Sequence, residues 1–264
     1  MDFSEAQIHR YARHIILDEV GGTGQAALLG AKVLVVGAGG LGSPLLMYLA
    51  AAGVGTLGIV DDDTVDLSNL QRQIAHTTAR IGDAKTASAH AMLAALNPDV
   101  RVIEHTLRLS PANAAALIAD YDLVADGSDN FATRFMLNDA CHLGGKTLVS
   151  AAVLRFDGQL STFKSYRGDG HPCYRCIYPA PPPDGLIPSC AEGGVLGAMA
   201  GTMGALQATE VIKEILGIGD SLSGTLLIYE GLGTSFRKVR VQPDPACALC
   251  GTNPTITTIQ ADAA

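Results

Sequence analysis

Four of the six cysteines form two C-x-x-C pairs in the second half of the chain, Cys173 with Cys176 and Cys247 with Cys250. Each pair has the spacing of a knuckle that presents two thiolates to one metal ion, and about seventy residues separate the pairs. In a reducing compartment, paired cysteines bind metals more often than they form disulfides. Four thiolates would complete the tetrahedral shell of Zn²⁺, which predicts a structural zinc site; redox thiols and an iron–sulfur cluster are the alternatives.

A glycine-rich segment in the first half could bind a nucleotide. Gly37, Gly39 and Gly42, with Gly40 between them, give the spacing G-x-G-x-x-G between an expected strand and an expected helix. Glycines let the backbone approach a phosphate closely, and a helix N-terminus favours negative charge. Asp61 ends the next expected strand, where an acidic residue would hold a ribose hydroxyl. Alone, this pattern is typical of an NAD or FAD site, or of a glycine turn without a ligand.

Charged residues further along favour a triphosphate over a dinucleotide. Arg72 lies in a long polar stretch after Asp61, and Lys85 stands at the start of an expected helix. A triphosphate needs such cations because its charge must be neutralised while the α-phosphorus is attacked. Asp129 follows another expected strand, and a carboxylate there can hold Mg²⁺. Singly, each residue is explained as a surface charge or a helix N-cap; together, at the carboxyl edge of one sheet, they predict an ATP site.

The two remaining cysteines differ in their surroundings. Cys190 stands in the glycine-flanked segment PSCAEGG, where a thiol would be accessible to a substrate. It is therefore a candidate functional thiol, and an incidental or buried cysteine is the alternative. Cys141 lies among apolar residues of an expected helix and is expected to be an inert core thiol.

Strands and helices alternate in the half of the chain that must position the nucleotide residues. The expected strands are Lys32–Val36, Thr56–Val60, Val100–Ile103, Asp122–Asp126 and Lys146–Ser150, with helices at about Leu41–Ala52, 83–97, Pro111–Ala119 and Phe131–Leu143. Antiparallel strands are then expected at Gln159–Lys164, Leu226–Tyr229 and Arg237–Val241. This order predicts an α/β fold: a Rossmann-like, doubly wound, mostly parallel sheet, extended by antiparallel C-terminal strands.

The N-terminal region should precede this sheet as a separate helix. Ser4 and Gln7 form a capping box that predicts a helix to about Leu17, with Arg13 near its end. A loop is expected at Val20–Gly24. We expect one domain over residues 1–251, made of the N-terminal helix (1–20), a nucleotide-binding half (30–150) and a zinc-tied half (151–251), followed by a tail (252–264).

Composition excludes several classes of partner. Of 264 residues, 48% are hydrophobic but only 5% aromatic, which suits the aliphatic core of a buried parallel sheet. The formal net charge of −8 argues against nucleic acid or an anionic membrane as the main partner. The apolar stretch Val195–Leu216 contains Gln207 and Glu210, so it predicts a buried or interface helix and not a membrane span. The N-terminus has no apolar signal core, which favours the cytoplasm.

These motifs, in this order, resemble the MoeB/ThiF/HesA family, the bacterial relatives of ubiquitin-activating enzymes. The matching segments include VLVVGAGGLGSP, DDDTVDLSNLQRQ, DGSDN, HPCYRC, SCAEGGVLG and CALCG, and the match runs from about Ser4 to Gly251. The resemblance implies that ATP adenylates the C-terminal glycine of a small ubiquitin-like sulfur-carrier protein, MoaD-like or ThiS-like. Pyrophosphate leaves, and the adenylate is later converted to a thiocarboxylate. Molybdopterin and thiamine biosynthesis both use such enzymes; the sequence is more similar to the molybdopterin type.

The resemblance also implies roles for individual residues. Asp61 would contact the ribose, Asp129 would hold Mg²⁺, and Arg13 would reach the triphosphate of a neighbouring subunit, which implies a homodimer with composite sites. Cys190 matches a cysteine that some members use in acyl or persulfide transfer. The nucleotide-binding candidates are Gly37, Gly39, Gly40, Gly42, Asp61, Asp63, Asn69, Arg72, Lys85, Asp129 and Asn130. The catalytic candidates are Arg13, Arg72, Lys85, Asp129 and Cys190. The zinc ligands are Cys173, Cys176, Cys247 and Cys250.

Other functions remain open at this point. An NAD(P)-dependent oxidoreductase with structural zinc would need a catalytic His, Tyr or Lys beside the nicotinamide and would leave Arg72 and Lys85 unexplained. A non-catalytic nucleotide-binding member or heterodimer half is disfavoured by the intact charged residues. Within the family, other carboxylates could be modified. Because no further domain follows CALCG, we expect sulfur to come from a separate donor protein.

Overall fold

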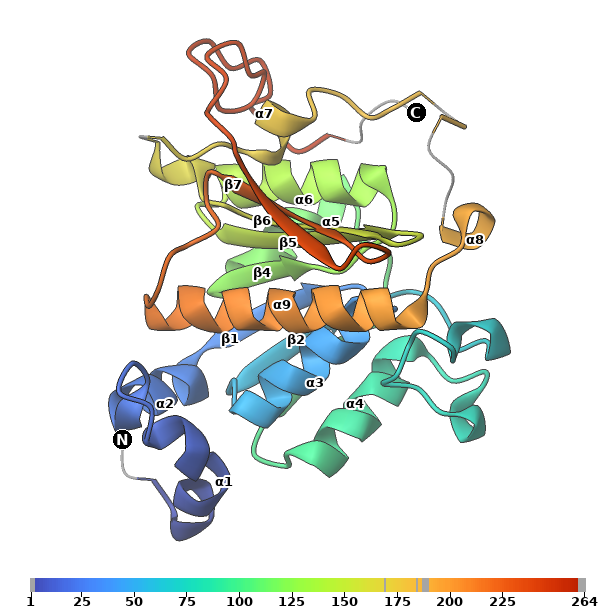
Figure 1. Ribbon diagram of the computed structural model, residues 1–264, viewed down its shortest axis with the longest axis vertical. Coiled ribbons are helices and arrows are strands. Elements are labelled where there is room, and N and C mark those ends of the chain that lie inside the picture. Colours follow the sequence, from blue (N-terminus) through green and yellow to red (C-terminus); the bar gives the residue numbers. More distant parts are fainter. Residues whose placement is uncertain (1–2, 169, 184, 187–189, 261–264) are drawn as a thin grey trace.

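A mixed eight-stranded sheet forms the centre of the computed structural model, which describes residues 3–168, 170–183, 185–186 and 190–260 (Figure 1). The strand order within these residues is β3-β2-β1-β4-β5-β6-β7-β8. The strands are β1 (Lys32–Val36), β2 (Thr56–Val60), β3 (Arg101–His105), β4 (Leu123–Asp126), β5 (Thr147–Leu154), β6 (Asp157–Phe163), β7 (Thr225–Glu230) and β8 (Ser235–Arg240). The expected fold class, a doubly wound sheet with antiparallel C-terminal strands, is confirmed.

The parallel half creates the crevice that a ligand needs. β1 pairs in parallel with β2 on one side and with β4 on the other, so the chain order changes direction between β1 and β4. In open α/β sheets, ligands bind outside the carboxyl ends of the strands at such a switch point. Val36 at the end of β1 pairs with Asp126 at the end of β4, which brings the two following loops together.

The antiparallel half extends the sheet away from this crevice. β5 continues to Leu154 and pairs antiparallel with β6 from Leu148, opposite Phe163, to Leu154, opposite Asp157. β5 is longer than the expected Lys146–Ser150, because its second half belongs to this hairpin. β7 and β8 complete the sheet, and β8 is exposed along its whole length.

Helices cover both faces of the sheet. They are α1 (Glu5–Ile15), α2 (Gly21–Gly30), α3 (Gly42–Ala52), α4 (Lys85–Leu96), α5 (Pro111–Ala119), α6 (Phe131–Leu143), α7 (Tyr174–Ile177), α8 (Cys190–Gly193) and α9 (Gly197–Leu216). Alternate residues of β1 serve two cores: Val33 and Val35 pack with α3, α4 and α9, whereas Leu34 and Val36 pack with α5 and α6. α9 crosses the front of the sheet in Figure 1.

The N-terminal region contains two helices where one was expected. The capping box of Ser4 and Gln7 starts α1 as predicted. The expected loop at Val20–Gly24 was wrong, because α2 begins at Gly21. Glycine at position 24 allows α2 to lie close to α9: a Cβ there would stand 3.1 Å from Val20 Cγ1 and 3.4 Å from Leu216 Cδ2. Tertiary packing therefore overrides the low helix propensity of this segment.

The end of the described chain packs onto the body of the protein. Thr252 donates a backbone hydrogen bond to Pro245 (2.9 Å), and Ile259 contacts the core beneath α5 and α6. The long apolar stretch forms α9, with Gln207 and Glu210 buried. Across the described segments, none of the helices combines the length and apolarity that a membrane span requires.

Candidate nucleotide site and metal centre

A cavity of about 830 Å³ lies at the carboxyl ends of β1, β2 and β4. Nine of the predicted nucleotide-binding residues line it: Gly37, Gly39, Gly40, Asp61, Asp63, Arg72, Lys85, Asp129 and Asn130. The cavity continues beside β5 and β6 to Gln159 and Tyr178, so it extends well beyond the glycine loop. One opening thus joins the parallel and antiparallel halves of the sheet.

The glycines of the loop divide into two kinds. Gly37 has φ +93°, and a Cβ there would lie 2.8 Å from the carbonyl oxygen of Gly127. At Gly42, a Cβ would collide with the carbonyl oxygen of Gly37. Both positions need glycine to close the β1–α3 turn against the loop after β4. Gly39 and Gly40 face the cavity, whereas Gly42 is buried at the start of α3 and does not line it.

Asp61 connects the end of β2 to the glycine loop. Its carboxylate accepts hydrogen bonds from the backbone N–H of Ala38 (2.8 Å) and of Asp63 (2.9 Å). Burial raises the pKa of Asp61, while the hydrogen bond from Ala38 and the charge of Lys85 act in the opposite direction. Carboxylate oxygens accept more than one hydrogen bond each, so a ribose hydroxyl could still bind there.

Lys85 reaches the cavity from the first residue of α4. Its side chain is buried, and its Nζ pairs with Asp63 Oδ2 at 2.7 Å. The backbone N–H of Lys85 also bonds to the carbonyl of Asp63 (2.9 Å), which closes the long polar loop between them. Arg72 is half-buried in this loop and donates from Nη1 to the carbonyl of Ser68 (3.0 Å). Two cations therefore stand beside the glycine loop.

The loop after β4 is fixed by a buried carboxylate. Asp126 accepts hydrogen bonds from the N–H (2.9 Å) and hydroxyl (2.6 Å) of Ser128 and from the hydroxyl of Ser150 (2.8 Å). This anchorage leaves Asp129 and Asn130 exposed at the cavity. Asn130 also caps α6, because its Oδ1 accepts from the N–H of Thr133 (2.8 Å). The carboxylate of Asp129 is thus accessible to a ligand in the cavity.

Some predicted residues lie elsewhere. Asn69 does not line the cavity; its Oδ1 accepts from the N–H of Asp66 (3.1 Å) and caps a short 3₁₀ turn. Cys190 is the first residue of α8, and its side chain lies outside the described part of the chain. Cys141 is buried in α6 as expected, and burial raises the pKa of its thiol.

Arg13 is remote from the cavity of its own chain. It is exposed on α1, the helix whose Arg10 donates to the carbonyl of Leu96 (3.0 Å) at the far end of α4. Lys85, at the near end of α4, lines the cavity. The helical rise of about 1.5 Å per residue puts roughly 16 Å between the two ends. Arg13 can therefore serve a nucleotide site only from another copy of the chain or after a large movement.

His76 supports the glycine loop, and sequence analysis did not identify it. Its buried ring bonds through Nε2 to the carbonyl of Ala38 (2.8 Å) and through Nδ1 to the hydroxyl of Ser88 (2.9 Å). Burial lowers the pKa of His76, which favours a neutral ring that donates from Nε2 and accepts at Nδ1. The signal for it was the polar loop after Asp61, which is too long to serve only as a connection.

Gln207 links the strands that end at the cavity. Its Nε2 donates to the carbonyls of Asp126 (2.8 Å) and Val149 (3.0 Å), which belong to the neighbouring strands β4 and β5. The side chain comes from the middle of α9 and is fully buried. α9 also carries Glu210, Lys213 and Glu214, so the polar character of Gln207 was not by itself a sequence signal for this role.

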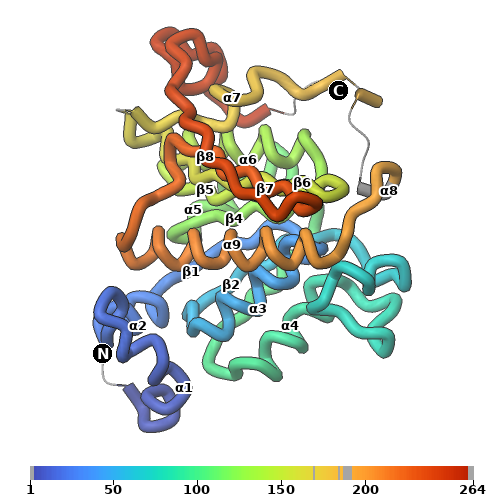
Figure 2. The backbone as a smooth tube through the Cα atoms, viewed as in Figure 1, coloured from blue at the N-terminus to red at the C-terminus, as the bar shows by residue number. Residues whose placement is uncertain are grey.

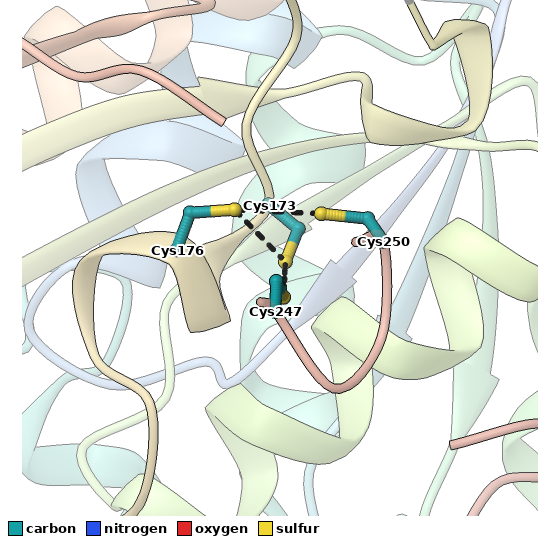
Figure 3. A group of neighbouring side chains, drawn as sticks. All are labelled: Cys173, Cys176, Cys247 and Cys250. Carbon is teal, nitrogen blue, oxygen red and sulfur yellow. Dashed lines mark hydrogen bonds between the residues drawn. The ribbon is translucent and has the colours of Figure 1, made fainter. Parts of the chain in front are cut away.

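The four paired cysteines form one cluster, as Figure 3 shows. The sulfurs of Cys173 and Cys176 are 3.9 Å apart, those of Cys173 and Cys247 3.5 Å, and those of Cys176 and Cys250 3.4 Å. A tetrahedral zinc shell with Zn–S bonds of about 2.3 Å places its sulfurs about 3.8 Å apart. The donor set and its spacing therefore fit Zn²⁺. In Figure 2 the segment around α7 and the loop near the C-terminus lie together at the top of the molecule.

Hydrogen bonds and an ion pair fix this cluster to the rest of the fold. The backbone N–H of Asp244 donates to Cys176 Sγ (3.4 Å), and the neighbouring thiols lower the pKa of Cys176 to about 2. Between the first two cysteines, Arg175 forms a bidentate pair with Asp139 of α6, with distances of 2.8 and 2.7 Å. Tyr174, beside Arg175, lines the cavity. The cysteine cluster and the cavity thus share contacts with α6 and α7.

Solved structures confirm the type of fold. A crystal structure of Escherichia coli MccB with AMPCPP and MccA matches with a TM-score of 0.81, covering 95% of this chain and 76% of that one at 20% identity. A structure of PaaA matches with a TM-score of 0.77, covering 92% and 76% at 21% identity. At these identities the likeness concerns the fold alone.

Closer relatives are found by sequence. A sulfur carrier protein adenylyltransferase of Thermus thermophilus is 49% identical over 97% of this chain and 95% of its own length. The probable adenylyltransferase/sulfurtransferase MoeZ of Mycobacterium tuberculosis and the adenylyltransferase and sulfurtransferase MOCS3 of Bos taurus are each 51% identical, over 92% and 97% of this chain. The chain spans only 62% and 56% of those two proteins. The model of the ThiF family matches residues 11–249. The chain therefore belongs to the ThiF family.

Proposed function

We propose that this protein uses ATP to adenylate the C-terminal glycine of a small ubiquitin-like sulfur-carrier protein. The single observation that carries the proposal is the composition of the cavity. One end gathers the glycine loop, Asp61, Arg72, Lys85 and Asp129, and the other end runs along β5 and β6. This arrangement has room for a nucleotide and for the end of a second polypeptide. The names of the relatives support a sulfur carrier as that polypeptide.

The chemistry asks little covalent help from the enzyme. The carrier's carboxylate is already ionised at neutral pH, so its oxygen attacks the α-phosphorus without a general base. The bond from the α-phosphorus to the bridging oxygen of the β-phosphate breaks, and pyrophosphate leaves. Arg72 and Lys85 offset the negative charge of the phosphates, and Asp61 orients the ribose. The salt bridge of Lys85 with Asp63 can open toward a phosphate because Asp63, unlike Lys85, is largely solvent-accessible.

Two metals complete the proposal. Asp129 would hold Mg²⁺, which supplies charge neutralisation at the phosphate oxygens. Cys173, Cys176, Cys247 and Cys250 would hold Zn²⁺ as a closed tetrahedral shell. A closed shell has no position for substrate, so the role of zinc would be structural. The contacts of Arg175 and Tyr174 with α6 explain how it would also support the cavity wall.

We further propose a homodimer with composite sites. The position of Arg13, exposed and remote from its own cavity, supports a role at the phosphates of the partner subunit. Arginine suits that role, since it stays charged and can form two hydrogen bonds to a phosphate at once.

The later sulfur-transfer step is a separate prediction. Cys190 stays a candidate for acyl or persulfide transfer, and the cytoplasm stays the expected compartment. A separate sulfur donor is also expected, although MoeZ and MOCS3, which are named sulfurtransferases as well, are longer than this chain. The pathway, molybdopterin or thiamine, depends on which carrier is accepted.

The competing oxidoreductase function has no support from the relatives. Those reported above are named adenylyltransferases. A nicotinamide site would also leave the pairing of Lys85 with Asp63, and the position of Arg72, without a role.

ATP–pyrophosphate exchange tests the proposal directly. The zinc-loaded enzyme is assayed with a MoaD-like carrier and with a ThiS-like carrier, each ending in glycine, and with the same carriers lacking the last glycine. Exchange that requires the intact carrier is expected, and the preferred carrier identifies the pathway. No exchange with either carrier, from a folded and zinc-loaded protein, would contradict the proposal.

A further inference from the structure

An arginine that the sequence motifs did not single out faces the same cavity. Arg134 lies one turn into α6 and lines the cavity. Its Nη2 donates to the carbonyl of Ser128 (2.8 Å), which directs the guanidinium back toward the loop that carries Asp129. Its Nε is buried, and no residue that the structure describes accepts a hydrogen bond from it. A buried donor without an acceptor costs free energy, which suggests that a ligand satisfies it.

Within the described residues, Arg134 is also a cation without a counter-ion. Lys85, a buried cation of the same cavity, is paired with Asp63 at 2.7 Å. Among the described residues, by contrast, no carboxylate lies within ion-pair distance of Arg134. Its neighbours are aromatic: the guanidinium carbon is 5.9 Å from the centre of the Phe131 ring, and Tyr174 and Tyr178 line the same wall. A half-buried, uncompensated guanidinium is a binding site for an anion.

The position of Arg134 indicates which anion. On one side it contacts Ser128, next to Asp129 and the nucleotide end of the cavity. On the other side is Tyr178, whose hydroxyl donates to Gln159 of β6 (2.6 Å). Arg134 and Tyr178 also line a small adjoining hollow with Gln159. The guanidinium therefore stands where the nucleotide end meets the end beside the antiparallel strands.

In the proposed reaction, the carboxylate of the acyl substrate must reach the nucleotide through the place where these two ends of the cavity meet. It carries a negative charge and has to approach the negatively charged phosphates, so their repulsion opposes attack. We propose that Arg134 binds the C-terminal carboxylate of the acyl substrate and aligns it with the α-phosphorus. The planar guanidinium can bind a carboxylate through Nε and one Nη in a bidentate geometry, and the free Nε is one of those donors. This assignment rests on the proposed adenylation reaction and adds a substrate-binding residue to it.

The test compares two forms of one carrier. Binding of the zinc-loaded enzyme is measured without ATP, using a MoaD-like carrier with its natural C-terminal carboxylate and the same carrier with a C-terminal carboxamide. The variants are Arg134→Met, Arg134→Lys and, as a matched control, Arg167→Met. Arg167 is also an arginine beside an aromatic ring, 5.8 Å from the centre of the Tyr166 ring, but it does not line the cavity.

The wild type should bind the carboxylate form of the carrier at least about tenfold more tightly than the carboxamide form, because charge-assisted hydrogen bonds contribute that much to affinity. Arg134→Met should lose this preference and keep the wild-type Kd for ATP, and Arg167→Met should behave as the wild type. Arg134→Lys should retain part of the preference, and it serves as the test if Arg134→Met does not fold. The inference would be overturned if Arg134→Met still preferred the carboxylate carrier, or if the wild type showed no such preference. It would also be overturned if Arg134→Met lost affinity for ATP by the same factor as for the carboxylate carrier.

The proposed reaction and this inference fail in different ways. If the wild type shows no carrier-dependent pyrophosphate exchange, the reaction itself is wrong. If the wild type exchanges pyrophosphate but Arg134→Met still distinguishes carboxylate from carboxamide, only the role of Arg134 is wrong.

Discussion

The charged residues in and beneath the cavity differ in how many internal partners each has. Lys85 is buried and paired with Asp63, Asp126 is fixed by three hydrogen bonds, and Asp129 is exposed. Arg72 is intermediate, since its guanidinium is anchored by one backbone carbonyl. Groups with few internal partners are the ones that can bind a ligand without first breaking the fold. Arg72 therefore offers the cleanest separation of catalysis from stability.

Replacing Arg72 with alanine should abolish most of the adenylation activity but change the stability of the protein little. We expect pyrophosphate exchange to fall by at least about 100-fold, as is typical when a group that stabilises transition-state charge is removed. The thermal midpoint should stay close to the wild-type value, because the lost hydrogen bond to Ser68 lies in a surface loop. Arg167→Ala is the matched control. Wild-type exchange in Arg72→Ala would remove Arg72 from the mechanism.

His76 should make the stability of the protein depend on pH. Burial lowers its pKa from 6.5, so near and below that pH the unfolded chain binds more protons than the folded one. Stability should therefore decrease as the pH falls below about 6.5, the ordinary pKa of histidine. His76→Gln should lose part of this dependence between pH 7 and pH 5. The rest should remain, because burial also lowers the pKa of His105 and His142.

The experiment is urea unfolding at several pH values. His9→Gln, a change at an exposed residue of α1, serves as the control and should keep the wild-type slope of stability against pH. An unchanged slope in His76→Gln would show that His76 is not held neutral between Ala38 and Ser88.

At the scale of elements, the cysteine cluster holds two distant segments together. Cys173 at the N-cap of α7 and Cys176 within α7 form one pair, and the loop after β8 supplies the other. Cys176→Ser should lose bound zinc and lower the thermal midpoint by at least about 5 °C, since metal binding contributes directly to folding. Zinc per chain is measured by atomic emission, and the midpoint by calorimetry.

Cys141→Ala provides the contrast to that variant. Cys141 is buried in α6, outside the cluster, so its replacement should lower the midpoint by leaving a small cavity while zinc stays bound. If Cys176→Ser instead kept both its zinc and its midpoint, the structural zinc site would be refuted.

The same scale shows what the sequence could predict. β1 and β2 were predicted with their exact bounds, because each is a short, mainly apolar segment with glycine directly next to one end, Gly37 after β1 and Gly55 before β2. α2 was not, since its start, Gly21 to Gly24, has low helix propensity and is helical only because it packs against α9. The two cysteine pairs were predicted to meet, and they do, because four thiols at that spacing suit one ion. Patterns that are local, or chemically specific, could be recognised from the sequence.

Residues whose partners lie far along the chain could not be recognised. His76 bonds to Ala38, 38 positions away, and Gln207 bonds to Asp126, 81 positions away. The importance of Arg134 depends on the cavity wall and on a buried Nε atom. Asn69, a motif residue expected at the phosphates, caps a 3₁₀ turn and does not line the cavity, so its role stays a prediction. These contacts exist only after the fold has formed.

At the scale of the whole molecule, α4 lies between the cavity and α1. Its first residue lines the cavity, and its last residue contacts α1, the helix that carries Arg13. Under the proposed homodimer, Arg13 would act in the site of the partner subunit and not in its own. In a two-fold dimer in which α1 of each subunit reaches the cavity of its partner, each site contains Arg72 from one subunit and Arg13 from the other.

This geometry predicts complementation between two inactive variants. Arg13→Ala and Arg72→Ala should each be inactive as homodimers. A heterodimer of the two, purified through a different tag on each subunit, has one site with both arginines intact and one site with neither. It should therefore recover about half of the wild-type pyrophosphate exchange. Mixed but unexchanged homodimers are the control and should stay inactive. A heterodimer with no recovered exchange would mean that Arg13 does not act across the subunit interface, and the composite site would have to be abandoned.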